Sequence, residues 1–343
     1  MSRTEAILRL LLALFILPCN TSISSAASTA DAFLHCLAAA IPPNLLHTPP
    51  SPSYSPLRLV RVPESVTVFT IRRSRKQLAT HLIAKWQEIA PALPPDLYLR
   101  VVVHNQDAQF QSLFLGRCDR LVSLMRAHFS DLGMVRADCE EITWIQSTMY
   151  FAFHSSFKPL ELLLDRGNKP DSYVKAKSDY VQVPIPWHVW ESTWTWLAKQ
   201  EAGILILDPY GGRMGSVAPS ATPFPHRKGN LYNLQYYSSW SENGTDAFDK
   251  HMAWVRGLYK QMEPYVSKNP RTGYVNYRDL DLGRNELGDN VTSYAKARVW
   301  GEKYFKGNFE RLAAVKAMVD PDDFFRNEQS IPPLPAAKGW NSM

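Results

Sequence analysis

Alternating and periodic apolar positions divide most of the chain into short strands and amphipathic helices. Residues 65–71 read SVTVFTI, an alternating and β-branched run that predicts a strand. Ser74 can cap a helix whose apolar stripe, Leu78, Leu82, Trp86 and Ile89, has helical spacing and ends before Pro91. The same patterns predict strands at 97–103, near 113, and at 173–181, 203–207 and 231–236. They predict helices from Asp119 onward and at 141–153, 159–165, 187–199, 245–266 and 308–319.

The order of these elements predicts the fold class. Strands and helices follow one another without a strict βαβ repeat, which favours an α+β fold in which helices cover one face of an antiparallel β-sheet. Residues 42–64 are rich in proline with interleaved serines and predict a loop or an extended linker. Residues 210–215 predict a loop after a strand, and residues 273–277 are predicted to be extended.

The first 26 residues have the pattern of a secretory signal peptide. Arg3 precedes an unbroken apolar run at 10–17, and residues 24–26 supply the small side chains that a signal peptidase needs. The run is too short to span a bilayer, and no later segment is long and apolar enough to do so. We therefore expect a secreted protein, extracellular or in the cell wall, with glycosylation at the sequons of Asn243 and Asn290.

Composition narrows the possible functions. Hydrophobic residues make up 45% of the chain and charged residues 20%, which are ordinary globular values. Glycine is scarce, at 16 of 343 residues, whereas nucleotide-binding domains need glycine where the backbone approaches phosphates. The net charge of +6 is spread over the chain, and the short basic cluster at 72–76 favours a solvated face, so we expect no nucleic-acid partner.

Cysteines and motifs exclude several chemistries. Without the signal peptide, Cys36, Cys118 and Cys139 remain, so at most one intramolecular disulfide can form, and its pairing is open. The chain has no C-x-x-C pair or close Cys/His group, so no metal site is predicted. G-x-G-x-x-G, P-loop, G-x-S-x-G and H-E-x-x-H motifs are also absent, and the glycines at 210–215 have the wrong spacing for a dinucleotide turn.

Longer strings carry a family resemblance. Residues 271–283 read RTGYVNYRDLDLG, and residues 299–334 read VWGEKYFKGNFERLAAVKAMVDPDDFFRNEQSIPPL. They resemble the C-terminal signature of the plant berberine bridge enzyme-like, or reticuline oxidase-like, FAD-linked oxidases. The resemblance extends through three further strings and an upstream one: 222–240 (TPFPHRKGNLYNLQYYSSW), 173–186 (YVKAKSDYVQVPIP), 138–151 (DCEEITWIQSTMYF) and 35–57.

The resemblance also implies a gap. In this family a large flavin-binding region follows the segment that SPSYSPL (51–57) resembles, and its histidine and cysteine attach the flavin covalently. Here that segment continues directly into 58–71, which implies that a domain-sized block is missing between Leu57 and Arg58 and that Cys36 has lost its partner. The implied fold is therefore the α+β substrate domain plus remnants of the flavin-binding domain at both ends. The implied divisions are a signal peptide (1–26), an N-terminal remnant (27–57), a substrate-binding domain (58–270), a family-specific C-terminal segment (271–334) and a tail (335–343).

Site residues follow from the matching positions. Gln235 falls where some members carry a glutamate base, and Asn233 falls in the substrate pocket, where several have a lysine that favours a neighbouring tyrosinate. Alternation along the predicted strand turns these two side chains to one face. Tyr277 matches the tyrosine proposed as the catalytic base of alcohol-oxidising members. Tyr274 and Asn276 match a Tyr-x-Asn pair that approaches the flavin in relatives.

The function implied by the resemblance is FAD-dependent oxidation by hydride transfer to the flavin. The substrate would be a small alcohol, carbohydrate or alkaloid-type molecule, and the enzyme would be a monomer. Because the covalent anchors are absent, FAD is not expected to be retained covalently by this chain. The alternative is a non-catalytic truncated form, such as a splice variant, a gene-prediction error or a pseudoenzyme, that acts at most as a binding protein.

Overall fold

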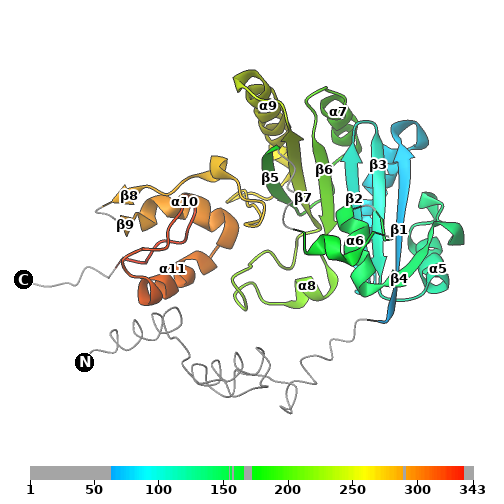
Figure 1. The fold of residues 1–343 in the computed structure, drawn as a ribbon, viewed down its shortest axis with the longest axis horizontal. Coiled ribbons are helices and arrows are strands. Elements are labelled where there is room, and N and C mark those ends of the chain that lie inside the picture. The colour runs from blue at the N-terminus through cyan, green and yellow to red at the C-terminus, as the bar shows by residue number, and fades with distance from the viewer. Residues whose placement is uncertain (1–62, 154, 157, 166–171, 289–290, 336–343) are drawn as a thin grey trace, which may run out of the picture. The chain divides into compact units, whose positions relative to one another are not determined.

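A computed structural model of the protein describes residues 63–153, 155–156, 158–165, 172–288 and 291–335. Its centre is a seven-stranded sheet with the order β4-β1-β3-β2-β6-β7-β5, and every neighbouring pair is antiparallel (Figure 1). In that order the strands are Glu140–Thr143, Ser65–Ser74, Asp107–Phe114, Leu97–His104, Ile204–Pro209, Tyr232–Trp240 and Tyr173–Val181. The predicted antiparallel α+β fold is confirmed.

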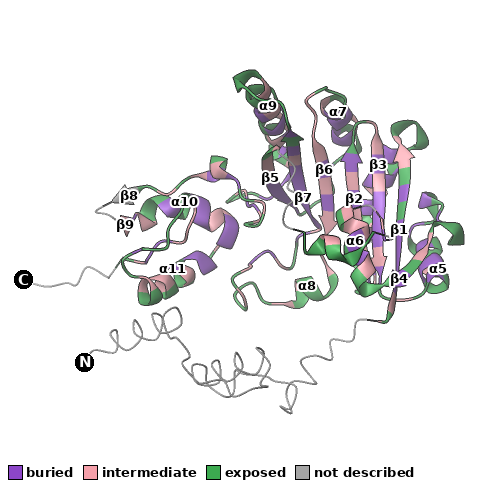
Figure 2. Cartoon of the chain, viewed as in Figure 1, coloured by how far each residue is buried: buried purple, intermediate pink, exposed green. Residues whose placement is uncertain are grey.

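Four helices pack on one face of this sheet and form the main core with it. They are α4 (Ala79–Ile89), α5 (Cys118–His128), α7 (Trp187–Leu197) and α9 (Thr245–Met262). Each contributes a buried apolar stripe, for example Trp86 of α4, Trp190 and Trp194 of α7 and Leu258 of α9. The stripes meet alternate strand residues such as Leu99 and Leu205, so buried residues concentrate in the strands and the inner helix faces (Figure 2). Burying each such side chain contributes about 1.5–3 kcal/mol to folding.

The opposite face of the sheet is covered in a different way. At the β4 end, α6 (Trp144–Phe153) packs on an apolar group that includes Val66, Val68 and Ile142. Toward β6, β7 and β5 no further long helix follows on this face in the described part of the chain, and irregular segments lie over it. Because loops rather than a helix cover this part, polar side chains of the sheet can take part in a site here.

The C-terminal part forms a small layer beyond the β5 edge of the sheet (Figure 1). It contains α10 (Tyr294–Phe305), α11 (Asn308–Val319) and a short hairpin of β8 (Leu287–Gly288) and β9 (Val291–Thr292). Trp300, Tyr304 and Phe309 are buried in a core of their own. The helices cross closely at Gly301, where a Cβ atom would lie 2.3 Å from the Phe309 ring. Glycine is therefore required at this point of α10.

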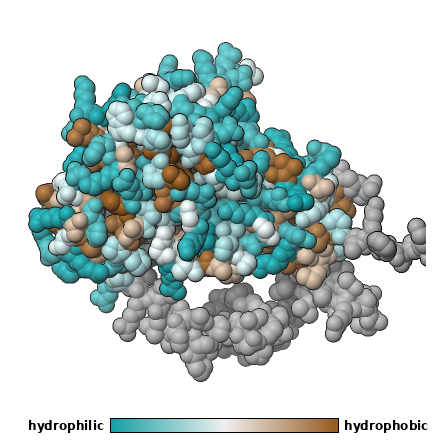
Figure 3. Space-filling view, turned by 180° about the vertical axis from the view of Figure 1, so that it is seen from behind, coloured by the Kyte–Doolittle hydropathy of each residue, from teal (hydrophilic) through white to brown (hydrophobic). Residues whose placement is uncertain are grey.

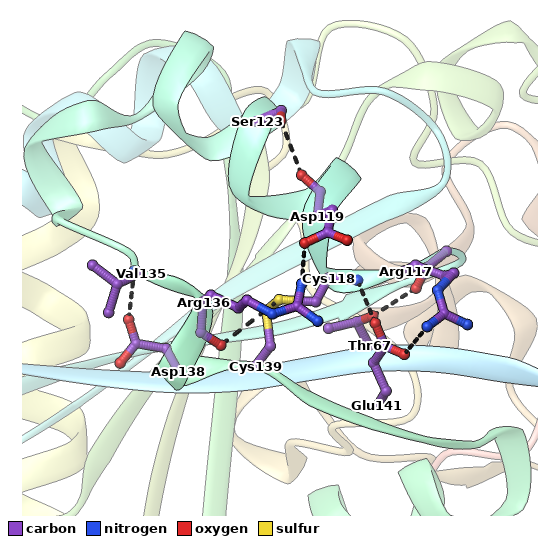
Figure 4. Close-up of a disulfide and its surroundings, with 11 residues drawn as sticks. Thr67, Arg117, Cys118, Asp119, Ser123, Val135, Arg136, Asp138, Cys139 and Glu141 are labelled. Carbon is purple, nitrogen blue, oxygen red and sulfur yellow. Dashed lines mark hydrogen bonds and ion pairs between the residues drawn. A yellow bond between two sulfur atoms is a disulfide. The ribbon is translucent and has the colours of Figure 1, made fainter.

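One disulfide joins the start of α5 to the segment before β4. Cys118 and Cys139 form it with a Cα–Cα distance of 5.9 Å and a sequence separation of 21 residues (Figure 4). The Cys118 backbone N–H donates to the Glu141 carboxylate, and Arg136 pairs with Asp119 beside the bridge. Closing a loop of this length stabilises the fold by about 3 kcal/mol in the chain-entropy account. The structure thus settles the pairing that the cysteine count leaves open.

Several predicted elements differ from the structure. Residues 141–153 do not form one helix, because Glu140–Thr143 first pair with β1 as strand β4. Residues 159–165 contain only the 3₁₀ turn Leu160–Leu163. The predicted loop after β6 holds the short helix α8 (Gly212–Ser216). It follows Gly211, whose φ of +154° and 2.1 Å approach of a Cβ to the Pro91 carbonyl oxygen require glycine.

Two differences concern the C-terminal part. Residues 273–277 are not an extended strand: the Tyr277 N–H donates to the Tyr274 carbonyl at 2.9 Å, which closes a turn. Helix α10 is not predicted at all, although Ser293 caps it by accepting from the Lys296 N–H. Its buried positions have helical spacing, so the pattern was present in the sequence.

Some predictions fall outside the described residues. These are the signal peptide, the 27–57 remnant with Cys36, the glycosylation site Asn290 and almost all of the tail. Asn243 is described and is exposed. Within the described ranges, no helix is long and apolar enough to cross a membrane. Seen from behind, the molecule shows mainly hydrophilic side chains with apolar ones scattered among them (Figure 3).

Candidate functional site

The candidate site lies on the face of β5, β6 and β7 that loops cover in place of a helix, which we call the open face. Directly opposite residues in antiparallel strands share a face, and the register places Asn233 between Asp208 of β6 and Tyr180 of β5. Gln235 lies two residues further along the same face, between Ile206 and Ser178. The structure therefore brings Asn233 and Gln235 to one face, and both side chains are buried.

The two amide side chains of this face are held differently. Asn233 donates from Nδ2 to the Asp179 carbonyl at 3.0 Å, whereas its Oδ1 is buried and has no hydrogen-bond partner among the described residues. The Gln235 side chain makes no hydrogen bond within the described part of the chain. An uncharged amide can orient a hydroxyl group by donating or accepting, but it cannot take a proton at neutral pH.

Residues 271–281 wrap the β5 edge of the sheet, and a buried ion pair fixes the first end of this segment. Arg271 donates to both oxygens of Asp179, at 2.7 and 2.6 Å, and Asp179 is fully buried. Tyr236 of β7 donates to the same carboxylate at 2.9 Å. The Arg271 guanidinium also lies over the Tyr259 ring, 3.3 Å from its centroid. A bidentate arginine–carboxylate pair defines orientation as well as distance, so it fixes where the segment begins.

A second buried ion pair fixes the other end. The Asp279 carboxylate, 2% exposed, accepts from Lys175 at 2.6 Å and from Lys177 at 2.5 Å. Lys177 lies 3.1 Å from Asp281, which also receives two hydrogen bonds from Arg256 of α9. The hydrogen bonds from Arg256 lower the pKa of Asp281 below its usual range, and the neighbouring lysines act in the same direction. The segment between the two ion pairs is therefore held at both ends.

Between these anchors lie the three predicted residues of the C-terminal segment. The Tyr274 N–H donates to Ser178 Oγ at 2.8 Å, and the Asn276 amide donates to Tyr274 Oη at 2.6 Å. The rings of Tyr274 and Tyr277 pack edge to face, 5.0 Å between centroids. Tyr277 and Tyr274 are half-buried and Asn276 is exposed. The structure thus brings Tyr274, Asn276 and Tyr277 together over the strands that carry Gln235 and Asn233.

Asp208 is the site residue that the sequence analysis missed. Tyr277 Oη lies 3.4 Å from Asp208 Oδ2, and Tyr98 of β2 donates to Oδ1 of the same carboxylate. The three residues come from sequence positions far apart, so no local motif joins them. The available signal was a carboxylate at the end of the apolar strand run GILIL.

The phenols of this cluster are kept protonated. Burial raises the pKa of Tyr277 above that of a free phenol, and the negative charge of Asp208 adds to the shift. Burial and then Asp208 likewise raise the pKa of Tyr98. Burial raises the pKa of Tyr210, the next tyrosine along the chain after β6, to about 12. A cation next to a phenol would favour its ionised form, but position 233 of β7 carries an uncharged asparagine.

An aromatic wall next to the cluster joins the sheet to α10. The His226 ring stacks on Tyr180 at 4.0 Å and contacts Phe224 edge to face at 5.3 Å. His226 Nε2 lies 2.8 Å from the Tyr304 carbonyl oxygen, so this nitrogen carries the proton. Its Nδ1 is buried without a partner among the described residues, and burial lowers the pKa of His226 to about 3.

This buried neutral histidine makes stability depend on pH. Histidine in the unfolded chain has a pKa of about 6.5, whereas His226 in the folded chain takes up a proton only near pH 3. The folded state is therefore most stable above pH 6.5, and it loses stability as the pH falls from there toward 3. Between pH 7 and pH 5 the loss should be about 2 kcal/mol. The variant His226→Asn keeps a hydrogen-bond donor but does not titrate. Between pH 7 and pH 5 its free energy of unfolding should therefore fall by about 2 kcal/mol less than that of the parent. Urea unfolding at both pH values measures it, and an unchanged pH dependence would contradict the assignment.

The described residues do not fit the cradle of a dinucleotide cofactor. Cys118 and Cys139 are consumed by their disulfide, so neither can attach a flavin. In the glycine pair after β6, Gly211 is required by the close approach of the Pro91 carbonyl oxygen. The same residues do fit a site for a small molecule with hydroxyl groups, since phenols, amides and one carboxylate converge on one face. Among the described residues, no group of three or more histidine, cysteine or carboxylate side chains could hold a metal ion.

The sequence is similar to proteins of one family of plant oxidoreductases. Residues 273–332 match the domain family described as Berberine and berberine like. The chain is 51% identical over 278 residues to berberine bridge enzyme-like Cyn d 4 of Cynodon dactylon, which covers 81% of this chain and 53% of that protein. It is 45% identical over 287 residues to monolignol oxidoreductase AtBBE-like 13 of Arabidopsis thaliana, covering 80% and 52%.

A solved structure matches as well. The crystal structure of Phl p 4, described as a grass pollen allergen with glucose dehydrogenase activity, superimposes with a TM-score of 0.77 at 48% identity. That match covers 80% of this chain and 56% of the allergen chain. The chain thus spans about half the length of the relatives it matches.

Proposed function

The chain belongs to the berberine bridge enzyme-like family, and we propose that its described part forms the substrate side of an FAD-dependent oxidoreductase acting on an alcohol or sugar hydroxyl group. The observation that carries the proposal is the cluster of Tyr277, Asp208 and Tyr98 on the open sheet face. Relatives described as a monolignol oxidoreductase and as a glucose dehydrogenase support a hydroxyl-bearing substrate.

The residues of the open face would bind the substrate, take its proton and face the cofactor. Tyr277 accepts a hydrogen bond from the substrate hydroxyl and takes its proton while its own phenolic proton passes to the Asp208 carboxylate, 3.4 Å away. Gln235 and Asn233 orient the substrate through their amide groups. Tyr274 and Asn276, which bond to each other, form the rim that faces the cofactor. The buried ion pairs of Asp179 and Asp279 keep this constellation in place.

The cofactor would be held outside the described residues. FAD, when bound, would accept a hydride from the substrate carbon, and the protein would position the two reactants. The Cys118–Cys139 disulfide and the scarcity of glycine both support a cofactor site outside the described residues. We therefore propose that the block expected between Leu57 and Arg58 is the part that binds FAD.

A non-catalytic role is the second candidate. The observation that favours it is that both described cysteines are joined in a disulfide and so cannot attach a flavin. In that case the open face would bind a hydroxyl-bearing ligand without converting it.

Secretion is part of the proposal. The apolar run at 10–17 supports a signal peptide, and a disulfide is stable in an oxidising compartment. Asn243 is exposed, as glycosylation requires.

The cofactor content of two proteins tests this proposal. The purified chain should show no flavin absorption band, because it lacks the anchoring region. A chimaera in which the flavin-binding region of a relative is inserted between Leu57 and Arg58 should hold flavin that stays attached after denaturation. A chimaera that folds but remains colourless would contradict the proposed division of labour. A flavin band in the unmodified chain would contradict it equally.

A further inference from the structure

We propose that Asn243 carries an N-linked glycan whose first sugar, an N-acetylglucosamine, binds in a polar depression between the turn after α7 and the start of α9. The inference rests on the proposed secretion and goes beyond it, because it assigns the sugar a binding site on the protein. Asn243 follows Trp240, the last residue of β7, whereas Asn233 lies next to the first residue of that strand. The depression is therefore separate from the open face.

The sequon lies in the short loop between β7 and α9 and has open space around it. Asn243, Gly244 and Thr245 are all exposed. Gly244 has a φ of +103°, and a Cβ atom at this position would meet nothing within 4 Å. The glycine is therefore needed for the backbone conformation and not for close packing, and the space beside the sequon can hold a bulky sugar.

A tyrosine at the start of β5 orients the amide that would carry the sugar. Tyr173 Oη donates to Asn243 Oδ1 at 2.9 Å. The Tyr173 ring stacks on Trp240 with 5.8 Å between centroids, and Trp240 in turn stacks on His251 of α9 at 4.7 Å. Because an N-glycosidic bond forms at Nδ2 and leaves Oδ1 free, the hydrogen bond from Tyr173 can persist in the glycosylated chain. The aromatic stack thus fixes the direction in which the first sugar leaves the protein.

The depression beside Asn243 has the size and the chemical groups that bind a sugar. Its volume is about 340 Å³, which is within the range of small-molecule pockets. Gln200 and Glu201 line it from the turn after α7, and Asp246 and Lys250 line it from α9. These four side chains make no hydrogen bond or ion pair with any other residue that the structure describes. They are therefore available to the hydroxyl and acetamido groups of a sugar.

The attachment step balances with a lipid diphosphate-linked oligosaccharide as the co-reactant. A bond forms between Asn243 Nδ2 and C1 of the first sugar, while the bond between C1 and the diphosphate oxygen breaks. The amide nitrogen loses one proton, and the lipid diphosphate leaves with the electron pair of the broken bond. Nothing is oxidised or reduced. In the folded chain the bound sugar links the turn after α7 to the start of α9, so it stabilises the fold.

Thermal unfolding of the secreted chain tests the inference. Every form carries Asn290→Gln, so that Asn243 holds the one remaining sequon of the mature sequence. A host that adds high-mannose glycans secretes the protein, intact mass gives the occupancy of Asn243, and endoglycosidase H trims the glycan to a single N-acetylglucosamine. The trimmed form should melt at the temperature of the untrimmed form, because the first sugar is the one that binds.

The unglycosylated form is Thr245→Ala, which removes the sequon but keeps Asn243 and its hydrogen bond to Tyr173. It should melt about 2–4 °C below the trimmed form, the shift that one net hydrogen bond gives in a domain of this size. Thr245→Ser, which keeps the sequon, is the matched control and should melt like the parent.

A second pair of variants tests where the sugar binds. In the double variant Gln200→Ala/Glu201→Ala, the difference between the trimmed form and Thr245→Ala should largely disappear. In Lys260→Ala, an exposed position of α9 outside the depression, the difference should remain. Because each difference is taken within one background, the effect of the lining substitutions on the fold itself cancels.

Each outcome decides the inference. A secreted chain without a glycan at Asn243 overturns it, and so does a trimmed form that melts with Thr245→Ala. A difference that persists in Gln200→Ala/Glu201→Ala also overturns it, because the glycan then stabilises the chain without the depression. The expected set of results supports it. No readout involves flavin or substrate, so a failed flavin chimaera would contradict the proposed oxidoreductase and leave this result standing.

Discussion

Tyr277→Phe should lower the rate of alcohol oxidation by about 10²–10⁴-fold in the chimaera that carries a restored flavin-binding region. The phenylalanine keeps the ring that packs on Tyr274 but removes the oxygen that contacts Asp208 and that we propose as the substrate's proton acceptor. Anaerobic stopped-flow measurement of flavin reduction follows the loss directly. Gln235→Ala should cost less, because an amide orients and does not take the proton.

Two comparisons separate this effect from a general disturbance. Tyr173→Phe removes a phenol oxygen that bonds to the exposed Asn243, far along β5 from the cluster, and should leave the rate unchanged. Asp208→Asn should lose activity near neutral pH and regain part of it at high pH, where Tyr277 can ionise without the opposing charge. Reduction of Tyr277→Phe at the parent rate would show that the base lies elsewhere.

Asp279→Leu should lower the free energy of unfolding by about 3–5 kcal/mol, because it removes the buried carboxylate that pairs with both Lys175 and Lys177. Lys177 is 3% exposed in its side chain and would keep Asp281, at 3.1 Å, as its remaining carboxylate partner. For a domain of this size the melting temperature should fall by roughly 6–20 °C. Differential scanning calorimetry measures the change.

The matched control is an exposed ion pair of the same segment. Glu328→Gln removes the partner of Arg278 at the surface and should leave the melting temperature close to the parent value. Adding Lys177→Met to Asp279→Leu should recover part of the loss, since an apolar pair can replace a buried ion pair. If Asp279→Leu melts at the parent temperature, the ion pair does not hold the 271–281 segment.

Local patterns in the sequence predict most of the sheet and its helices. The alternation at 65–71 and 97–103 follows from one face of each strand being buried under helices, so these strands are recognised directly. The buried residues of helix α10, Ala297, Trp300, Gly301 and Tyr304, have helical spacing. The helix is missed because a glycine in its middle weakens the helical pattern. That glycine is explained only by the approach of Phe309 from α11.

The candidate site could be predicted only in part. Asn233 and Gln235 fall on one face because a strand alternates, and the family resemblance supplies Tyr274, Asn276 and Tyr277. Asp208 and Tyr98 join the site through contacts between residues that are 69 and 110 positions apart in the chain. Such partners are set by strand order and register, which local patterns do not contain. The same holds for the lysines of β5 that bind Asp279.

The central claim is that the open face of β5, β6 and β7 is the substrate side of an oxidoreductase, and anaerobic flavin reduction in the restored chimaera tests it most directly. The account predicts that an alcohol or a sugar bleaches the flavin band and that Tyr277→Phe slows this reduction at least a hundredfold. A chimaera that folds and binds flavin, yet is reduced by no alcohol or sugar, would contradict the account.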